Sequence, residues 1–322
     1  MIKNPTAVIY GTGKRFNNNY FLQFLLPEIT KIYNVQGISD KKKPDFLGKI
    51  NLKFIERSSK LKRYDYIIIT SDIYYEEIRN ELIVEFEIDE KTIIPLNAIE
   101  ERIKFHPELF VNLKGIEIGG PSDIFKTIYS VCKNCDGVNY NENTVWWEDS
   151  GRGYNYKEKL LGDVIIADAV DLSLIKDDVY DFCLSSNNLE HIANPLKALF
   201  EFRRIVKSNG YILIVVPRKE KCFDHRRNVT TIEHLVEDYK NNVDEEDLTH
   251  LDEIINFHDI EMDPGVASLE EFIERSQKNF KNRCLHHHIF DEQLLQKIFK
   301  FIEVNILDSG EILGNYYIIG KV

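Results

Sequence analysis

Apolar and polar positions follow one another in blocks along the first hundred residues, and these blocks predict strands and helices in turn. Residues 64–70 (YDYIIIT) form a near-continuous apolar run, which is typical of a strand buried on both faces of a parallel sheet. Further strands are predicted at 7–10, 34–39 and 92–96, and helices at 21–30 and 73–82. This alternation favours an open parallel α/β sheet.

The pattern pauses near residues 106–107 and then begins again. Strands are predicted at 113–118, 137–140, 164–167, 180–184 and 211–216, with a helix at 195–206 and a turn at 208–210. Residues 223–300 are polar and mostly helical in periodicity, and an antiparallel pair is predicted at 301–307 and 316–320. We expect an α/β protein with two Rossmann-like domains, 1–106 and 107–322, the second carrying a helical, histidine-rich insertion at 223–300 after its fifth strand.

Length and composition narrow the class of protein. A chain of 322 residues suggests two domains, and 43% apolar with 29% charged residues is ordinary for a globular chain. The apolar run at 211–216 is far shorter than the ~20 residues that a membrane helix needs, and the N-terminus shows no signal peptide. Five unevenly spaced cysteines do not form a disulfide framework. These features predict a cytoplasmic protein.

The charge is distributed unevenly between the two predicted domains. Residues 1–106 carry 17 Lys and Arg against 15 Asp and Glu, whereas the remainder carries 24 against 38. An acidic surface lacks the counterion release that drives binding to phosphate backbones, and it is repelled by anionic lipids. We therefore expect neither nucleic acid nor a membrane as a partner.

The most specific signal in the second domain is a glycine-rich turn after a predicted strand. Glu117 lies near the end of the strand, and Gly119 and Gly120 follow it. Glycines let the backbone approach a ligand, and the helix that follows presents free N–H groups. Such a turn alone is weak evidence. It is strengthened by Asp168, Asp181 and the segment NLEHIANPLKAL, which follow in order at predicted strand ends and helices.

This succession, completed by RIVKSNGYILIVVP, resembles the class I S-adenosylmethionine (SAM)-dependent methyltransferases. The resemblance covers residues 113–217, and 301–322 would supply the last two strands of that fold. It implies SAM as the cofactor, with the methionine end lined by Glu117, Gly119 and Gly120.

The resemblance also implies roles around the rest of the cofactor. The family holds the ribose with an acidic residue after its second strand, and here Asn139, Asn141 and Glu142 compete for that position. Asp168 and the Ala169 backbone correspond to the adenine contact, and Ser186, Asn187 and His191 to the segment that faces the transferred methyl group.

Several of these residues also have a purely structural interpretation. Glu117 could be a solvated carboxylate at a strand end, and His191 a satisfied histidine at a helix start. Asp168 could cap a loop by bonding its own backbone. Asp181 is expected to cap or begin a buried strand, so we assign it no catalytic role.

Seven of the nine histidines lie between residues 225 and 288, where class I enzymes commonly insert substrate-recognition elements. Methyl transfer to oxygen or nitrogen benefits from a general base, and histidine has a suitable pKa. The candidate bases are His191, His225 and His250. Arginines offer donors for an anionic or polyhydroxyl substrate. The candidate substrate-binding residues are Arg226, Arg227, His258 and His287.

Three interpretations of this histidine cluster stay open. It could be a polar insertion with local hydrogen bonds, a substrate pocket with one histidine as base, or a metal site. Because no HExxH or similar motif is present, we assign no metal ligand. Cys132 and Cys135 form a C-x-x-C pair without a second pair, which we interpret as coincidental. Trp146 and Trp147 are expected to pack against their own loop.

The first domain has the start of a nucleotide-binding pattern. Gly11 and Gly13 follow the first strand, but Phe16 stands in the place of a third glycine. Asp40 lies 27 residues past Gly13, somewhat late for a ribose-binding acid. Short Rossmann-like domains of this kind resemble modules attached to bacterial surface-polysaccharide enzymes. A docking or dimerisation domain fits equally well.

The sequence as a whole predicts a SAM-dependent methyltransferase. The expected acceptor is an oxygen or nitrogen of a small polar molecule, a sugar or nucleotide-linked sugar in surface polysaccharide biosynthesis. Two alternatives stay open: a non-catalytic nucleotide-binding scaffold, and an NAD-dependent oxidoreductase that uses the first domain. A homodimer is a possible assembly.

Overall fold

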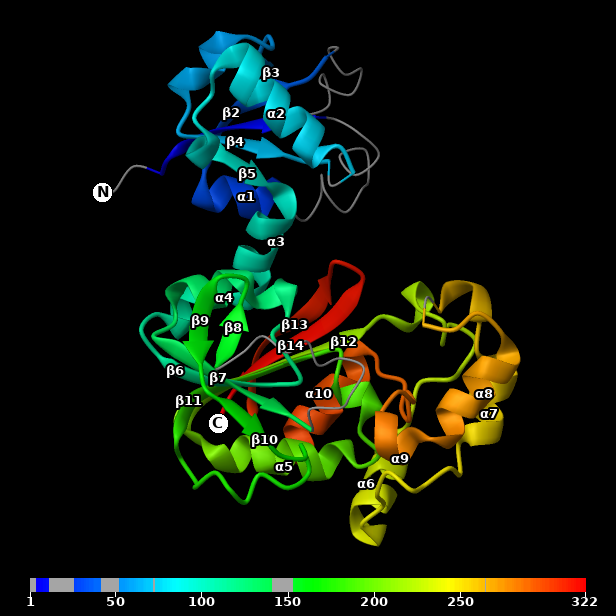
Figure 1. The fold of residues 1–322 in the computed structure, drawn as a ribbon. Coiled ribbons are helices and arrows are strands. Elements are labelled where there is room, and N and C mark those ends of the chain that lie inside the picture. The colour runs from blue at the N-terminus through cyan, green and yellow to red at the C-terminus, as the bar shows by residue number, and fades with distance from the viewer. Residues whose placement is uncertain (1–3, 12–25, 42–51, 72, 141–152, 264) are drawn as a thin grey trace. The chain divides into compact units, whose positions relative to one another are not determined.

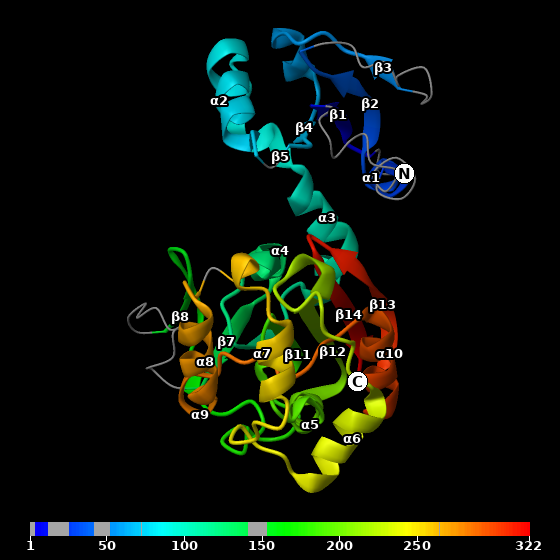
Figure 2. The same ribbon diagram turned by 90° about the vertical axis from the view of Figure 1, so that its right-hand side faces the viewer.

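The computed structural model describes residues 4–11, 26–41, 52–71, 73–140, 153–263 and 265–322. By its internal contacts the chain divides into two units, Met1–His106 and Pro107–Val322. We call them the first and the second unit, and each is described by itself (Figures 1 and 2).

The first unit contains a five-stranded parallel sheet with the order β3-β2-β1-β4-β5. Its strands are β1 (Thr6–Tyr10), β2 (Asn34–Ser39), β3 (Lys53–Phe54), β4 (Tyr66–Ile69) and β5 (Ile93–Pro95). Its α-helices are α1 (Leu26–Ile32), α2 (Tyr75–Phe86) and α3 (Leu96–Phe105). The chain reverses direction across the sheet between β1 and β4, which is the arrangement of a doubly wound sheet.

Alternation along β1 gives this sheet two apolar faces. Ala7 and Ile9 pack in one cluster with residues of α1 and α3, whereas Val8 and Tyr10 pack in a second cluster with residues of α2. Because successive side chains of a strand point to opposite faces, both faces of the sheet are covered.

The second unit contains a seven-stranded sheet with the order β10-β7-β6-β11-β12-β14-β13. Five strands are parallel: β6 (Lys114–Ile118), β7 (Asn134–Asn139), β10 (Val164–Ile166), β11 (Tyr180–Ser186) and β12 (Val206–Pro217). β14 (Asn315–Lys321) lies antiparallel between β12 and β13 (Asn305–Ile312). The expected terminal antiparallel pair is therefore present.

One face of this sheet carries the main core. Ile116 and Ile118 of β6 pack in one cluster with residues of three helices, α5 (Pro195–Ile205), α6 (Ile232–Asn241) and α10 (Glu292–Phe301). The intervening Glu117 points to the opposite face, toward α4 (Lys126–Val131) and the hairpin of β8 (Tyr154–Tyr156) and β9 (Lys159–Gly162). This alternation decides which residues of the glycine-rich turn can reach a ligand.

The helices of the core face begin at strong caps. Asn194 accepts a hydrogen bond from the Lys197 N–H at the start of α5, and Pro195 occupies its first turn. Asp291 accepts from the Leu294 N–H at the start of α10. Both helices then bury apolar residues at three- and four-residue spacing, as an amphipathic helix requires.

The chain between β12 and α10 is mainly helical. It contains α6, α7 (Leu251–Phe257), α8 (Leu269–Gln277) and the short α9 (Asn279–Asn282). Ile254, Phe272 and Leu285 form a small buried cluster separate from the main core. This stretch, residues 218–291, is called the helical segment below.

The structure corrects three local expectations. Residues 208–210 do not form a separate turn but lie within β12, where Asn209 adopts a φ of +69° and donates its N–H to the Val322 carbonyl. The strand expected at 301–307 begins later, because α10 continues to Phe301. The β8–β9 hairpin was not predicted, since its polar sequence lacks a strand-like apolar run.

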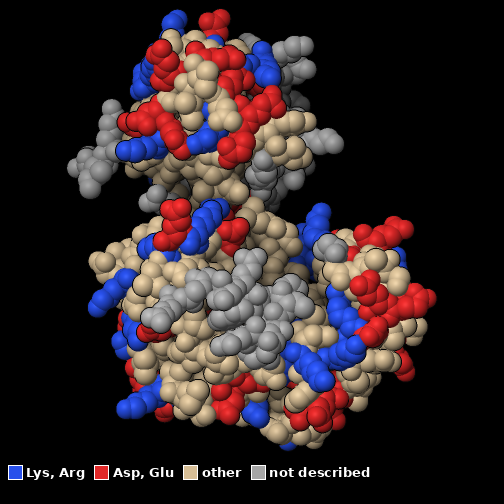
Figure 3. All heavy atoms as spheres, viewed as in Figure 1, with Lys and Arg blue, Asp and Glu red and all other residues tan. Residues whose placement is uncertain are grey.

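The surface is mixed in charge. On the face drawn in Figure 3, Lys and Arg side chains lie among Asp and Glu side chains rather than in one large patch. None of the helices that the structure describes combines the length and the apolar composition needed to cross a bilayer.

Candidate active site

A cavity of about 440 Å³ opens at the carboxyl ends of the parallel strands of the second unit. Ligands of doubly wound sheets bind at this edge. The strand ends contribute Ile118, Asn139, Ala167, Asn187 and Pro217, and the helical segment contributes Phe223, Glu245, Arg283 and His286. The volume lies in the range of small-molecule sites.

The floor of the cavity beside β6 is bare backbone. Gly119 has a φ of +82°, which favours glycine, and its N–H donates to the Val138 carbonyl. A Cβ at this position would stand 2.7 Å from Asn188 Oδ1. The turn can therefore present its peptide groups closely to a bound molecule.

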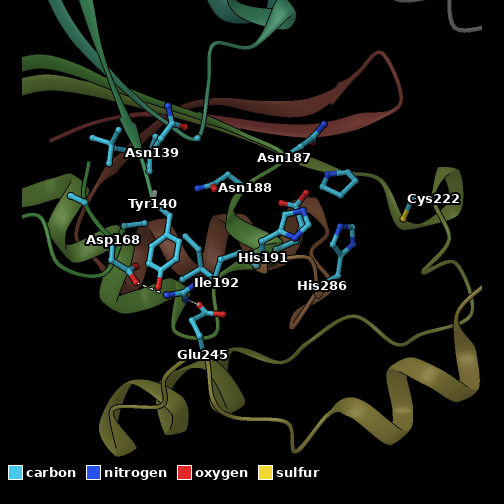
Figure 4. A pocket seen from close by; sticks show the side chains of 18 of the residues that line it. Asn139, Tyr140, Asp168, Asn187, Asn188, His191, Ile192, Cys222, Glu245 and His286 are labelled. Atoms are coloured by element: carbon cyan, nitrogen blue, oxygen red, sulfur yellow. Dashed lines mark hydrogen bonds and ion pairs between the residues drawn. The ribbon is translucent and has the colours of Figure 1, made fainter. Parts of the chain in front are cut away.

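A second wall joins the sheet to the helical segment. Arg283 Nη2 lies 2.9 Å from Asp168 Oδ2, and Arg283 Nη1 lies 2.9 Å from Glu245 Oε1. The guanidinium also stacks over the ring of Tyr140, 4.0 Å from its centroid. Figure 4 shows Asp168 and Tyr140 on one side of the cavity with Asn139.

The opposite end of the cavity carries three titratable side chains. Glu190 and His191 come from the short turn η7 (Leu189–His191) after β11, and His286 comes from the end of the helical segment. The two imidazole rings meet edge to face with centroids 4.5 Å apart (Figure 4). Burial raises the pKa of Glu190 to about 7 and holds the pKa of His191 well below its usual range.

A buried carboxylate orients His286. Its Nδ1 is hydrogen-bonded to Asp224 Oδ2, and Arg227 Nη1 donates to Asp224 Oδ1 over 3.2 Å. Burial opposes the imidazolium form, but the Asp224 carboxylate outweighs it and raises the pKa of His286. The same histidine and arginine hold the pKa of Asp224 low against the effect of burial.

Glu117 does not line the cavity. It is fully buried and accepts hydrogen bonds from the hydroxyls of Tyr129 and Tyr154, the latter at 2.8 Å. Burial raises its pKa to about 7 although these hydrogen bonds lower it. A Cβ on Gly120 would stand 2.2 Å from the Glu117 carboxyl carbon, so this glycine makes room for the carboxylate.

Most of the other residues expected at the cofactor line the cavity, and one does not. Gly119, Asn139, Asp168, Ala169 and Asn187 line the cavity, and so does His191 among the expected bases. Ser186 lies one position before the lining residue Asn187 and is buried in β11.

Two of the expected bases lie outside the cavity lining. His225 Nε2 lies 3.6 Å from Asp259 Oδ2, within the helical segment. His250 Nε2 lies 2.9 Å from His234 Nε2, beside α6. Both rings are engaged by neighbours within the helical segment rather than by the cavity.

The expected substrate-binding residues have structural partners in the helical segment. Arg226 is bonded to Asp259, and His258 Nε2 lies 3.1 Å from Asp263 Oδ2 while its ring stacks on Phe272. Arg227 is buried and donates to the carbonyls of His286 and His287. His287 Nε2 lies 3.1 Å from Glu245 Oε2.

Sequence reasoning missed several residues of the cavity. Glu190 stands next to His191 in the motif that carried the resemblance, so its position was a usable signal. His286 could not be distinguished from the two histidines that follow it, because the choice among them depends on which one faces Asp224. No local pattern marked Arg283 or Glu245.

Some expected residues lie outside the described part of the chain: Asn141, Glu142, Trp146, Trp147, Gly13 and Phe16. Gly11 is described, with a φ of +89° at the end of β1, and Asp40 follows β2. Cys132 and Cys135 are buried free thiols whose pKa values burial raises.

Comparison with known families decides what this cavity belongs to. Residues 117–214 match a family described as "Methyltransferase domain", a span that includes the glycine-rich turn, Asp168 and the Glu190–His191 turn. Residues 117–214 therefore belong to a SAM-dependent methyltransferase domain. SAM is its cofactor.

Other similarities are partial. Residues 3–94 match a family described as "C2185-like, N-terminal". An uncharacterized protein of Methanocaldococcus jannaschii is 49% identical over 45 residues, which cover 14% of this chain and 20% of that protein.

Solved structures of methyltransferases are similar only at a low level. A SAM-dependent methyltransferase from Aquifex aeolicus is 12% identical with a TM-score of 0.40, covering 78% of this chain and 98% of its own. One from Methanosarcina mazei is 15% identical with a TM-score of 0.40, covering 67% and 95%. Similarity at this level carries no weight for function.

The residues of the cavity fit SAM. The bare backbone at Gly119 suits the methionine end, because a side chain there would fill the space and collide with Asn188. Ile118, Val138 and Ala167 offer an apolar surface for the adenine, and Asn139 offers an amide for the ribose hydroxyls. Asn188 lies between Asn139 and His191 in Figure 4.

Proposed function

We propose that the protein transfers a methyl group from SAM to an oxygen or nitrogen of a small polar molecule. The observation that carries this proposal is the continuity of the cavity, which runs from Gly119, Asn139 and Asp168 to Glu190, His191 and His286. When bound, SAM supplies an electrophilic methyl group. The task of the protein is to hold the acceptor in line with it and to manage the acceptor's proton.

The chain divides these tasks between the two ends of the cavity. The strand ends hold the cofactor, and the end with Glu190, His191 and His286 receives the acceptor. His191 was expected there from the sequence, and His286 with Asp224 adds an oriented imidazole. These are the groups close enough to hold or remove a proton from the acceptor.

We propose a sugar or nucleotide-linked sugar as the acceptor, in surface polysaccharide biosynthesis. The polar side chains Asn187, Asn188 and Glu190 suit hydroxyl groups, which need paired donors and acceptors when they are buried. The helical segment, which brings Glu245, Arg283 and His286 to the cavity, is the proposed recognition element.

The first unit is proposed to be a Rossmann-like nucleotide-binding or docking domain. Its strand order and the positive φ of Gly11 at the end of β1 support a ligand site at the switch point. Calorimetric titration with nucleotides and nucleotide sugars tests this role separately from methyl transfer.

The first experiment measures cofactor binding. Titration of the protein with SAM and with S-adenosylhomocysteine should give saturable binding of both, whereas NAD should not bind the second unit. Transfer of labelled methyl from SAM to a panel of sugars and nucleotide sugars then identifies the acceptor. Absence of SAM binding in the folded protein would overturn the proposal.

Gly119→Ala tests the position of the cofactor. A Cβ at Gly119 would collide with Asn188 and displace this lining side chain, so SAM affinity should fall at least about tenfold. Gly310→Ala is the matched control, because its Cβ would meet Tyr317 only at an ordinary 3.4 Å. Equal affinities of the two variants would place the cofactor elsewhere.

A further inference from the structure

We infer that Glu190, His191 and His286 together bind one divalent metal ion at the acceptor end of the cavity. Each side chain offers one ligand atom, and these atoms lie within 4.8 Å of one another. His191 and His286 lie side by side in Figure 4. The ion's place in catalysis rests on the proposed function, whereas its binding does not.

One ring nitrogen of each histidine makes the kind of contact that is typical of histidines that bind a metal through the other nitrogen. A ligating histidine usually donates its other ring N–H to a carboxylate or a backbone carbonyl, which fixes the ring. His286 Nδ1 contacts the buried Asp224 carboxylate, and His191 Nδ1 lies 3.1 Å from the Leu285 carbonyl. In both rings Nε2 is then the atom suited to ligate.

Glu190 supplies the negative charge that a cation site needs. The residue is 2% exposed, lines the cavity, and its Oε2 has no hydrogen-bond partner among the described residues. A carboxylate buried in this way is costly unless it is neutralised or paired. A cation held between Glu190 and the two imidazoles provides that pairing.

A second cluster of similar composition is less suited to a metal. His234, Asp238 and His288 also place ligand atoms within 4.8 Å. However, His288 Nε2 lies 3.0 Å from the Ala193 carbonyl, while its Nδ1 has no partner among the described residues. His234 Nε2 lies 2.9 Å from His250 Nε2. The two Nε2 atoms that face Asp238 are therefore already engaged, that of His234 with the His250 ring and that of His288 with backbone.

The ligand set selects the class of ion. Two imidazoles and one carboxylate suit zinc, cobalt, iron(II) or manganese, whereas calcium and magnesium prefer oxygen ligands alone. Three protein ligands leave coordination positions open, and these can face the cavity that the three residues line.

The open positions explain how an acceptor hydroxyl is activated. A hydroxyl bound to the ion has a lowered pKa, and its proton leaves to water. The oxygen then forms a bond to the methyl carbon of SAM, the carbon–sulfur bond breaks, and its electron pair stays on sulfur as S-adenosylhomocysteine forms. In this arrangement the histidines hold the ion, and the ion takes the place of the base that the proposed function assigns to them.

The test measures bound metal directly. Full-length protein is stripped with a chelator, dialysed against Co²⁺ or Zn²⁺, and analysed for metal content, and the visible spectrum of the Co²⁺ form is recorded. We expect one tightly bound equivalent that Glu190→Gln and His286→Gln lose, with loss of the Co²⁺ bands in His286→Gln. Circular dichroism and thermal melting show whether each variant is folded.

Asp238→Asn is the matched control, since it removes the carboxylate of the second cluster and should keep the bound equivalent. Absence of tight binding in the wild type, or loss of binding in Asp238→Asn with retention in a folded Glu190→Gln, would overturn the inference. SAM titration of the stripped protein separates the two proposals. SAM binding and full methyl transfer without metal contradict only the role of the ion in catalysis, and Co²⁺ binding without SAM binding contradicts only the proposed function.

Discussion

Arg283 shows how one residue can connect two parts of the active site. Its guanidinium is bonded to Asp168 on the sheet and to Glu245 in the helical segment, and it covers the ring of Tyr140. A planar fork of donors can satisfy two carboxylates at once, which a lysine cannot do. Arg283 therefore fixes the wall beside which the adenine and ribose are expected to lie.

Replacement of this arginine should weaken cofactor binding. In Arg283→Lys the charge is kept but one of the two carboxylates loses its partner, so the SAM dissociation constant should rise about three- to tenfold. Calorimetry measures the change. Arg275→Lys is the control, because Arg275 bonds Asp263, which does not line the cavity. A dissociation constant equal to that of the control would show that the fork is not needed.

Asp224 offers a second test at the scale of a residue. Asp224→Asn keeps the size of the side chain but removes the charge behind His286, and loss of such a contact typically weakens metal binding 10- to 100-fold. Equilibrium dialysis with Co²⁺ measures this change, while SAM affinity should stay the same because Asp224 does not line the main cavity. Unchanged Co²⁺ affinity in the folded variant would contradict the role of Asp224.

At the scale of elements, α10 anchors the core face of the second sheet. Leu294, Leu295, Ile298 and Phe299 are buried on one side of this helix. They pack in the cluster that also contains α5 and the strands β6 and β12. The stability of the whole unit should therefore be sensitive to this helix.

Truncation of a buried leucine of α10 tests how much this helix contributes to the free energy of unfolding. Leu295→Ala should lower the free energy of unfolding by about 2–5 kcal/mol, because a fully buried leucine leaves a cavity when it is removed. Urea unfolding measures the loss. Lys297→Ala changes an exposed position of the same helix and should stay within about 0.5 kcal/mol of the wild type. Similar losses in both variants would mean that helix propensity, not packing, is decisive.

The helical segment should respond to acid through its buried histidine. Burial lowers the pKa of His258 below 6.5, although Asp263 and Asp224 raise it and Arg275 lowers it. The unfolded chain then binds the proton first, so this contribution to stability is present above pH 6.5 and is lost as the pH falls. Unfolding of the wild type and His258→Gln at several pH values between 7.5 and 5.5 should show a smaller acid loss in the variant. Parallel pH profiles would contradict this contribution.

Most strands could be predicted from the sequence, because a parallel strand that is buried on both faces consists of a run of apolar residues. β2 occupies the expected residues 34–39, and the strands at Tyr66–Ile69 and Val164–Ile166 lie within the expected ranges. The start of β12 and the start of β13 differ from the predicted residues, because hydrogen bonds across the sheet and the packing of α10 determine where these strands begin. Such long-range effects leave no local trace in the sequence.

Only the part of the site that belongs to the recognised succession of motifs could be predicted from the sequence. Gly119, Asp168 and His191 follow one another in the order that carried the resemblance. His286 comes from 95 positions beyond His191, and its two neighbours look the same in sequence. The backbone turns His287 toward Glu245 and His288 toward the Ala193 carbonyl, which leaves His286 for the cavity.

At the scale of the whole molecule, the described cavity is built within the second unit. Its lining residues lie between Ile118 and His286, and the clusters of the first unit contain other residues only. A chain of residues 107–322 should therefore fold and bind SAM within about threefold of the full-length affinity. Calorimetry on both chains measures this, and a folded second unit without SAM affinity would show that the first unit contributes to the site.

The two ends of the cavity come from different parts of the chain, and this affects how such a protein can evolve. Strand ends and turns between Ile118 and Asn187 form the cofactor end, whereas Phe223, Glu245, Arg283 and His286 come from the helical segment, which has a small core of its own. Mutations elsewhere in this segment that keep Arg283 and its two ion pairs can reshape the acceptor end and leave the cofactor end intact. A lineage of such proteins could therefore change the molecule that it methylates many times while inheriting its methyl donor unchanged.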